Sequence, residues 1–148
     1  MQEGADRKIK ILFVCIGNMC RSQMAEGFAS HYGGDFVEAY SAGTHHTGVV
    51  SRHAAAAMME KGVDISRQYS KGIEDVPFME MDYVVTMGCC SADQLCPVAY
   101  RGDKIDWPIE DPVGHSAMIF ERVRDDIEER VKKLLEQIWK GQKQQKNG

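Results

Sequence analysis

Residues 11–28 read ILFVCIGNMCRSQMAEGF, and this stretch decides the fold. An apolar run ends at Cys15, a polar loop of five residues follows, and Arg21 begins a segment with apolar residues at helical spacing. The pattern therefore predicts a buried strand, a loop and a helix in direct succession. It also places a cysteine and an arginine at the two ends of the loop.

The rest of the chain repeats this alternation of strands and helices. Further strands are predicted at residues 36–43, at residues 82–87 and near residues 104–107. Helices are predicted at residues 21–32, from Ser51 to Gly62 and from Ile119 to Ile138. Alternating strands and helices favour a parallel sheet covered on both faces. We therefore expect an α/β fold with a four-stranded parallel sheet and helices on both faces.

Length, charge and cysteine content limit the classes of protein. The 148 residues suggest a single catalytic domain with its core at about residues 8–139, a flexible N-terminus and a flexible polar tail at 141–148. The net charge of −4 disfavours nucleic acid, and no apolar run reaches the ~20 residues that cross a membrane. Because the N-terminus also lacks the features of a secretory signal, we expect a cytoplasmic protein. In that reducing compartment, five cysteines indicate catalytic or metal-binding use.

The loop after the first strand is suited to binding a tetrahedral oxyanion. A helix N-terminus directs backbone N–H groups and partial positive charge at one point, and the same field stabilises a thiolate at Cys15. Gly17 permits close backbone approach, Arg21 can hold two oxygens, and Ser22 can donate a hydrogen bond to the sulfur of Cys15. The predicted substrate-binding residues are Ile16, Gly17, Asn18, Met19, Cys20, Arg21 and Ser22. We expect Cys15 to be a nucleophile toward phosphorus or arsenic.

A second group of cysteines follows the strand at residues 82–87. Residues 86–97 read TMGCCSADQLCP, with Cys89, Cys90 and Cys96. Because parallel strands end at the same edge of a sheet, where ligands bind in such folds, this segment and the first loop are expected to meet. Cys20, in contrast, is expected to point into the core. His45 and His46 are expected to be exposed, and the chain has no ligand spacing that predicts a metal site.

The first loop resembles that of a known family. Residues 14–26, VCIGNMCRSQMAE, are similar to the loop of the low-molecular-weight tyrosine phosphatase fold, and Asp111-Pro112 matches the family's late Asp-Pro. This resemblance implies that Asp111 is the general acid. The cysteine-rich segment and the sequence RVRDDIEERV at 122–131 resemble thioredoxin-coupled arsenate reductases, a branch of the same fold.

The resemblance to that branch implies a relay of three thiols. Cys15 attacks arsenate held by the loop and Arg21, and Asp111 protonates the departing oxygen. Cys89 attacks Cys15 and releases arsenite; Cys96 then attacks Cys89, and thioredoxin reduces the Cys89–Cys96 disulfide. The resemblance implies no cofactor beyond these reducing equivalents, and we expect a monomer.

Several alternatives stay open at the level of sequence. Cys90 has no counterpart in the family pattern and is a spare thiol, a partner in another disulfide or a packed side chain. The same loop also suits hydrolysis of phosphate monoesters, which needs only one cysteine, or a noncatalytic oxyanion or redox sensor. A glutaredoxin system is an alternative reductant.

A further departure from the family concerns potassium. Some relatives bind this ion beside the loop, and Asn18, Glu26 and Ser41 match part of that site. Lys71 stands where such relatives carry an acid, and Tyr69 stands where they carry an uncharged hydroxyl. We expect the Lys71 ammonium to take the place of the ion beside Glu26, so that the protein has no strong potassium requirement.

Overall fold

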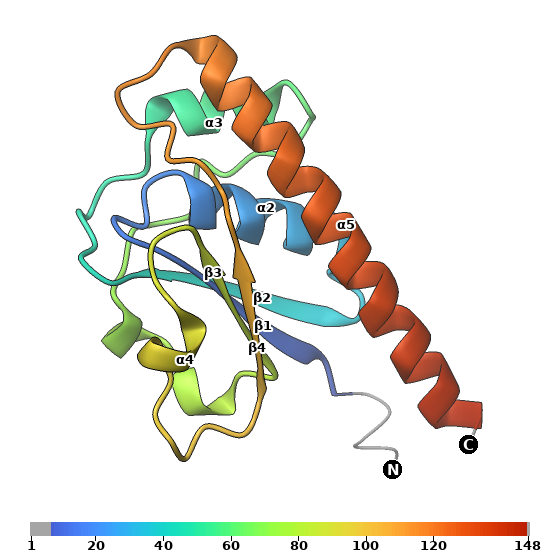
Figure 1. The fold of residues 1–148 in the computed structure, drawn as a ribbon. Coiled ribbons are helices and arrows are strands. Elements are labelled where there is room, and N and C mark those ends of the chain that lie inside the picture. Colours follow the sequence, from blue (N-terminus) through green and yellow to red (C-terminus); the bar gives the residue numbers. More distant parts are fainter. Residues whose placement is uncertain (1–6, 148) are drawn as a thin grey trace.

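The structure, a computed structural model, describes the backbone of residues 7–147, so residues 1–6 of the expected flexible N-terminus lie outside it. A parallel sheet with the strand order β2-β1-β3-β4 forms its centre (Figure 1). Its four strands are β1 (Ile9–Cys15), β2 (Val37–Gly43), β3 (Tyr83–Met87) and β4 (Asp103–Trp107). The predicted four-stranded parallel sheet is confirmed.

Helices cover both faces of the sheet, as the sequence predicts. The helical segments are α2 (Arg21–Gly33), α3 (Arg52–Met59), η1 (Ile73–Asp75), η2 (Phe78–Glu80), α4 (Ala92–Leu95) and α5 (Ala117–Asn147). In Figure 1, α2 and α5 lie together on one face with α3 beside them, and α4 and the short 3-10 turns lie on the other. The predicted cap at Ser51 is confirmed, because its side chain accepts a hydrogen bond from the Ala54 amide.

The alternation of side chains along β1 explains its continuous apolar sequence. Ile11 and Phe13 belong to the core cluster that also contains the buried residues of α2 and α5. Leu12 and Val14 belong to a second cluster, which includes Tyr100. All four β1 side chains are fully buried, as expected for a central strand of a parallel sheet.

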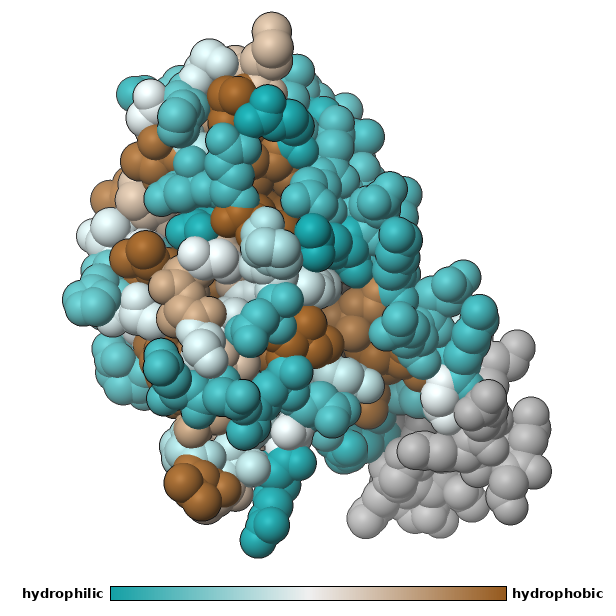
Figure 2. All heavy atoms as spheres, viewed as in Figure 1, coloured by the Kyte–Doolittle hydropathy of each residue, from teal (hydrophilic) through white to brown (hydrophobic). Residues whose placement is uncertain are grey.

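The long C-terminal helix has the predicted amphipathic pattern. Its buried stripe comprises Val123, Ile127, Val131, Leu134, Leu135 and Ile138, whereas Ile119 is only half-buried. α5 continues through residues 141–147 to Asn147, and the expected flexibility of this tail stays a prediction. Hydrophilic side chains cover the side of the molecule along which α5 runs (Figure 2). Within residues 7–147, no helix is apolar enough over a sufficient length to cross a bilayer.

The strand register brings the loops of interest to one edge of the sheet. Cys15 is paired with Gly43 of β2, Val14 with Thr86 of β3, and Met87 with Trp107 of β4. The chain therefore leaves β1, β3 and β4 at the same edge. The Cys15 loop, the Cys89–Cys96 segment and the Asp111 loop begin there.

Candidate active site

Asn18 holds the loop after β1 in its conformation. Its backbone has a φ of 51°, in the left-handed region that asparagine tolerates, and its side chain is fully buried. Asn18 Oδ1 accepts hydrogen bonds from the Lys71 amide (2.9 Å) and from Gln23 Nε2 (2.8 Å), while Nδ2 donates to Ser22 Oγ (2.7 Å). Because a backbone amide can only donate, the contact with Lys71 fixes which end of the Asn18 amide faces Ser22.

Cys15 ends β1 with its sulfur 2.9 Å from Ser22 Oγ and only 2% of its surface exposed. Ser22 already accepts a hydrogen bond from Asn18, so its own hydroxyl hydrogen can point at the sulfur. A hydrogen bond donated to sulfur favours the thiolate over the thiol. This geometry agrees with the predicted role of Cys15 as a nucleophile.

Arg21 is the first residue of α2 and is 4% exposed. Its Nη1 donates to the carbonyl oxygens of Met87 (2.7 Å) and Ile109 (3.2 Å), and its Nη2 lies 3.8 Å from Asp111 Oδ2. The guanidinium is thus held between the end of β3 and the connection that follows β4. It lines one pocket together with Cys15, Gly17, Met19, Cys20, Asp111 and Val113.

Asp111 lies on the connection between β4 and α5, with its side chain half exposed. Its Oδ1 accepts a hydrogen bond from the Val113 amide at 3.0 Å, which leaves Oδ2 on the side of Arg21. The structure therefore brings the predicted acid, arginine and nucleophile into one pocket. A carboxyl group at the mouth of an anion pocket can exchange protons with both solvent and bound substrate.

Cys89 also lies near this pocket. Gly88 before it has a φ of 84°, and an added Cβ there would lie 2.3 Å from the Ile109 oxygen and 3.1 Å from Arg21 Nη1. A glycine is therefore required where the segment passes Arg21. Cys89 Sγ lies 3.7 Å from the carbonyl oxygen of Val14, the residue that precedes Cys15.

The cysteine-rich segment contains three thiol side chains in different surroundings. The structure joins Cys89 to Cys90, whereas Cys96 is a free, buried thiol at the end of α4. Cys96 belongs to the cluster of Val14 and Tyr100, and burial raises the pKa of its thiol. Cys96 lies at the C-terminal end of α4 and Cys90 is the immediate neighbour of Cys89, so the Cys89–Cys96 disulfide of the relay stays a prediction.

Cys20 is placed as the sequence predicts. It is 3% exposed and belongs to the main core cluster, and burial raises the pKa of its thiol to about 11. A neutral thiol of this kind is a poor nucleophile. Its backbone still belongs to the oxyanion-binding loop.

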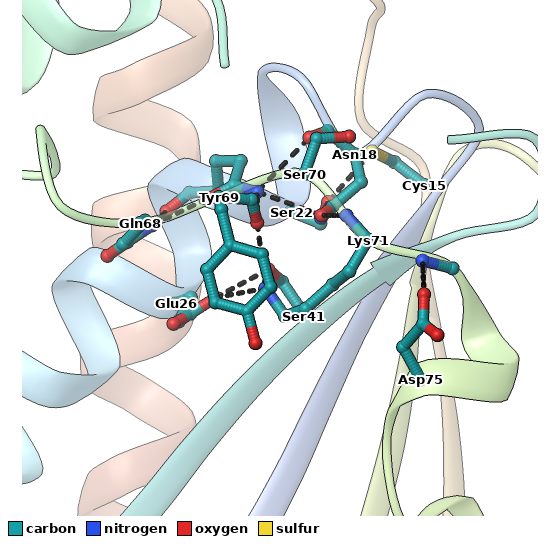
Figure 3. A network of polar contacts seen from close by, with 12 residues as sticks. Cys15, Asn18, Ser22, Glu26, Ser41, Gln68, Tyr69, Ser70, Lys71 and Asp75 are labelled. Atoms are coloured by element: carbon teal, nitrogen blue, oxygen red, sulfur yellow. Dashed lines mark hydrogen bonds and ion pairs between the residues drawn. The ribbon is translucent and has the colours of Figure 1, made fainter. Parts of the chain in front are cut away.

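The Lys71 ammonium lies beside Glu26, as expected (Figure 3). Its Nζ is 3.6 Å from Glu26 Oε1 and donates to Ser41 Oγ (3.3 Å) and the Tyr69 carbonyl oxygen (3.0 Å). Ser41 in turn donates to Glu26 at 2.5 Å. The ammonium thus occupies a polar enclosure directly behind the loop.

Sequence reasoning missed two residues that support the loop. Gln23 is fully buried and donates hydrogen bonds to Asn18 and to the Tyr69 carbonyl oxygen, and Ser70 donates to the Gly17 carbonyl oxygen. Gln23 could have been found from the sequence, because it is a polar residue among the inward-facing positions of α2. Ser70 gave no such signal, because its partner is a backbone atom far away in the sequence.

His45 and His46 are exposed, as predicted. His46 lies with Glu74 and Asp75, and their potential ligand atoms are within 4.8 Å of one another. All three side chains are exposed, and none lines the Cys15 pocket. We assign this group no role.

Fold and pocket together define a class of proteins: residues 10–145 match the low molecular weight phosphotyrosine protein phosphatase family, to which the chain belongs. Within that family, curated relatives at about 40% identity are named arsenate reductases. An arsenate reductase of Brevibacillus brevis is 40% identical over 132 residues, which cover 88% of this chain and 97% of that protein.

Solved structures of arsenate reductases are also similar to the chain. One described as an arsenate reductase in the phosphate binding state has a TM-score of 0.78 and 37% identity, covering 88% of this chain and 98% of that one. The thioredoxin-dependent arsenate reductase of Corynebacterium glutamicum has a TM-score of 0.75 and 30% identity, covering 95% of this chain and 65% of that one.

Proposed function

We propose that the protein is an arsenate reductase that supplies two electrons to arsenate from its own cysteines. One observation carries the proposal: the Cys15 pocket and the Cys89–Cys90 pair lie at the same edge of the sheet, with Cys89 Sγ 3.7 Å from the carbonyl oxygen of Val14. A phosphatase needs only the first of these thiols. The arsenate reductase names of relatives about 40% identical to the chain support the same enzyme class.

The first step is attack on arsenate by the Cys15 thiolate. The oxyanion is bound by the amides of the loop at residues 16–22 and by the Arg21 guanidinium. Ser22 supports the thiolate through its hydroxyl. Asp111 donates a proton to the departing oxygen, which leaves as water, and a bond between Cys15 sulfur and arsenic(V) forms.

The second step reduces arsenic. The Cys89 thiolate attacks the Cys15 sulfur, the pair of electrons in the sulfur–arsenic bond leaves with arsenic, and arsenite departs. Cys15 and Cys89 are then joined by a disulfide. A further thiol of the segment displaces Cys15 and renews the nucleophile; the sequence-based relay assigns this step to Cys96.

An external dithiol completes the cycle, and we propose thioredoxin. The thioredoxin-dependent relative supports this reductant. A relay of free thiols also requires a reducing compartment, which supports a cytoplasmic location. We propose that the enzyme acts as a monomer, since the groups assigned to the reaction come from one chain.

Arsenate-dependent oxidation of NADPH tests the proposal. We expect turnover with thioredoxin and its reductase, a lower rate with a glutaredoxin system, and no turnover by Cys15→Ser or Cys89→Ser variants. Cys20→Ser is the matched control, because Cys20 is a buried thiol of the same loop that the relay does not use. Arsenite formation by Cys89→Ser at the wild-type rate would contradict the relay.

Hydrolysis of phosphate monoesters is the second candidate function. The family's description and the pocket lined by Cys15 and Arg21 favour it. A Cys89→Ser/Cys96→Ser double variant separates the two functions, because it retains the complete loop and lacks two of the proposed relay thiols. Hydrolysis of an aryl phosphate by this variant would show that the loop retains phosphatase chemistry, whereas arsenite release that depends on Cys89 and Cys96 would support the reductase.

A further inference from the structure

Gln23, the third residue of α2, connects this helix to the loop that precedes it. Its side chain is fully buried, and its Nε2 donates to the backbone oxygen of Asn18 (3.1 Å), to Asn18 Oδ1 (2.8 Å) and to the Tyr69 carbonyl oxygen (2.9 Å). Gln23 Oε1 accepts a hydrogen bond from Gln68 Nε2 at 2.7 Å. Because a backbone carbonyl group can only accept, these contacts fix which end of the Gln23 amide faces Asn18.

The three acceptors of Gln23 differ in what else holds them. Asn18 Oδ1 also accepts a hydrogen bond from the Lys71 amide, and the Tyr69 carbonyl oxygen also accepts one from Lys71 Nζ. Among the residues that the structure describes, only Gln23 donates to the backbone oxygen of Asn18. A buried carbonyl group without a donor is unfavourable, so the orientation of the Asn18 carbonyl depends on Gln23.

The Asn18 carbonyl in turn determines the direction of the next amide. The peptide bonds of the described residues are trans, and in a planar trans peptide the C=O and N–H groups point in opposite directions. With the Asn18 oxygen turned toward Gln23, the Met19 N–H points to the other side of the loop. Met19 lines the pocket with Cys15 and Arg21, whereas Gln23 is not among the residues that line it. The Met19 N–H therefore faces the pocket.

We propose that Gln23 is a positioning residue, which holds the Asn18–Met19 peptide with its N–H toward the bound oxyanion. The proposal deepens the proposed function and rests on its first part, the binding of a tetrahedral oxyanion in the Cys15 pocket. If the peptide flipped, the Asn18 oxygen would face the anion in place of a donor. One contact with the oxyanion would then change from attractive to repulsive.

The contacts of Asn18 separate the role of Gln23 from that of Ser22. Without Gln23, the Asn18 side chain keeps its contact with the Lys71 amide, so Nδ2 continues to donate to Ser22 Oγ beside the Cys15 sulfur. Loss of the Gln23 amide should therefore weaken oxyanion binding and leave the reactivity of the Cys15 thiol unchanged.

Gln23→Met tests the proposal, since methionine is similar in size and has no N–H group to donate. Alkylation of Cys15 by neutral iodoacetamide is followed in the tryptic peptide of residues 11–21 at increasing concentrations of inorganic phosphate, which protects the thiol when it binds. We expect at least a roughly tenfold loss of phosphate affinity, with an alkylation rate in the absence of phosphate within about threefold of wild type.

Phe28→Leu, a core change about two turns further along α2, is the control for lost stability and should keep the phosphate affinity of wild type. Equal phosphate affinity in Gln23→Met and wild type overturns the proposal. An alkylation rate that falls in parallel with phosphate affinity also overturns it, because that result indicates a general loosening of the loop.

The Met19 amide gives a second test in the wild-type protein, which does not depend on the folding of a variant. In isotope-labelled protein, phosphate should move the amide proton resonance of Met19 downfield, as a hydrogen bond to an anion does. A Met19 resonance that stays in place while phosphate binds overturns the role of Gln23 and leaves the reductase intact. If phosphate does not bind to wild type, the oxyanion-binding step of the proposed function fails together with this proposal.

Discussion

The hydroxyl of Ser22 connects the most buried polar residue of the loop to the nucleophile. Asn18 is fixed by the Lys71 amide, donates to Ser22, and so leaves the Ser22 hydrogen for the Cys15 sulfur. Each of these groups is buried, so each hydrogen bond forms away from competing water. At the scale of single residues, these contacts hold the Ser22 hydroxyl beside the sulfur of Cys15.

Removal of the Ser22 hydroxyl tests this role. A hydrogen bond to a charged group contributes about 1.5–3 kcal/mol, so we expect Ser22→Ala to slow alkylation of Cys15 and arsenate turnover by roughly 10- to 100-fold. Ser30→Ala, on the exposed face of the same helix, is the matched control. Equal alkylation rates in the two variants would show that the hydroxyl does not support the thiolate.

The burial of Cys20 predicts a pH-dependent stability. In the unfolded chain its thiol ionises near the ordinary pKa of 9.0, whereas burial raises the pKa in the folded protein to about 11. The native state thus prefers the neutral thiol, and this contribution is complete below pH 9 and lost as the pH rises toward about 11. We expect a loss of ~2–3 kcal/mol.

Urea unfolding of wild type and Cys20→Ala across this pH range measures the effect. The alanine side chain does not ionise, so the difference between the two free energies of unfolding should shrink as the pH rises. Other titrating groups act on both proteins and cancel in the difference. A difference that is independent of pH would contradict the buried, neutral state of Cys20.

At the scale of elements, Asp106 of β4 determines where the cysteine-rich segment begins its helix. It joins the Ala92 amide of α4 to the Thr86 hydroxyl of β3. The four-residue helix α4 has few hydrogen bonds of its own, so it depends on this contact. The Cys89–Cys90 pair lies between Thr86 and α4.

Asp106→Ala should release this segment while leaving the Cys15 pocket intact. We expect faster amide hydrogen exchange across residues 88–96 and unchanged alkylation of Cys15. Asp103→Ala, an exposed position of the same strand, serves as control. If exchange in the segment is the same in both variants, the anchor has been assigned to the wrong residue.

The segment around Lys71 predicts the response to monovalent cations. The ammonium already pairs with Glu26 and donates to Ser41, so wild-type activity should be the same in sodium and potassium salts. In Lys71→Ala the same oxygens lose their cation, and potassium should restore part of the lost activity. A large potassium stimulation of the wild-type enzyme would refute this account.

At the scale of the whole molecule, the sequence predicts the sheet, its covering helices and the shared edge of the loops. These features follow from local patterns: the apolar run at residues 11–14, the strand ending at Met87 and the amphipathic stripe of α5. The pocket residues Cys15, Arg21 and Asp111 were found because the motif carries their chemistry. The sequence did not predict the contacts of Arg21 with the Met87 and Ile109 carbonyl oxygens. A backbone carbonyl group is present in every residue, so no residue type marks it as a partner.

The cysteine pairing shows where sequence reasoning reaches its limit. Spacing and resemblance identify Cys96 as a relay thiol, but they contain no information about its burial. In the structure, Cys96 is buried at the end of α4 and Cys90 lies beside Cys89, so the role of Cys96 in the relay stays a prediction. Whether a thiol is accessible depends on packing by residues far away in the sequence, such as Leu12 and Val14, which the motif around Cys96 does not include.

A single turnover without reductant measures most directly whether electrons pass between the two loops. Fully reduced protein is mixed with excess arsenate, and arsenite and remaining free thiols are counted. The account predicts about one arsenite released and about two thiols lost per protein molecule. Cys89→Ser should release none. Arsenite release by that variant, or none by wild type, would contradict the transfer of electrons from the Cys89 segment to arsenic bound at Cys15.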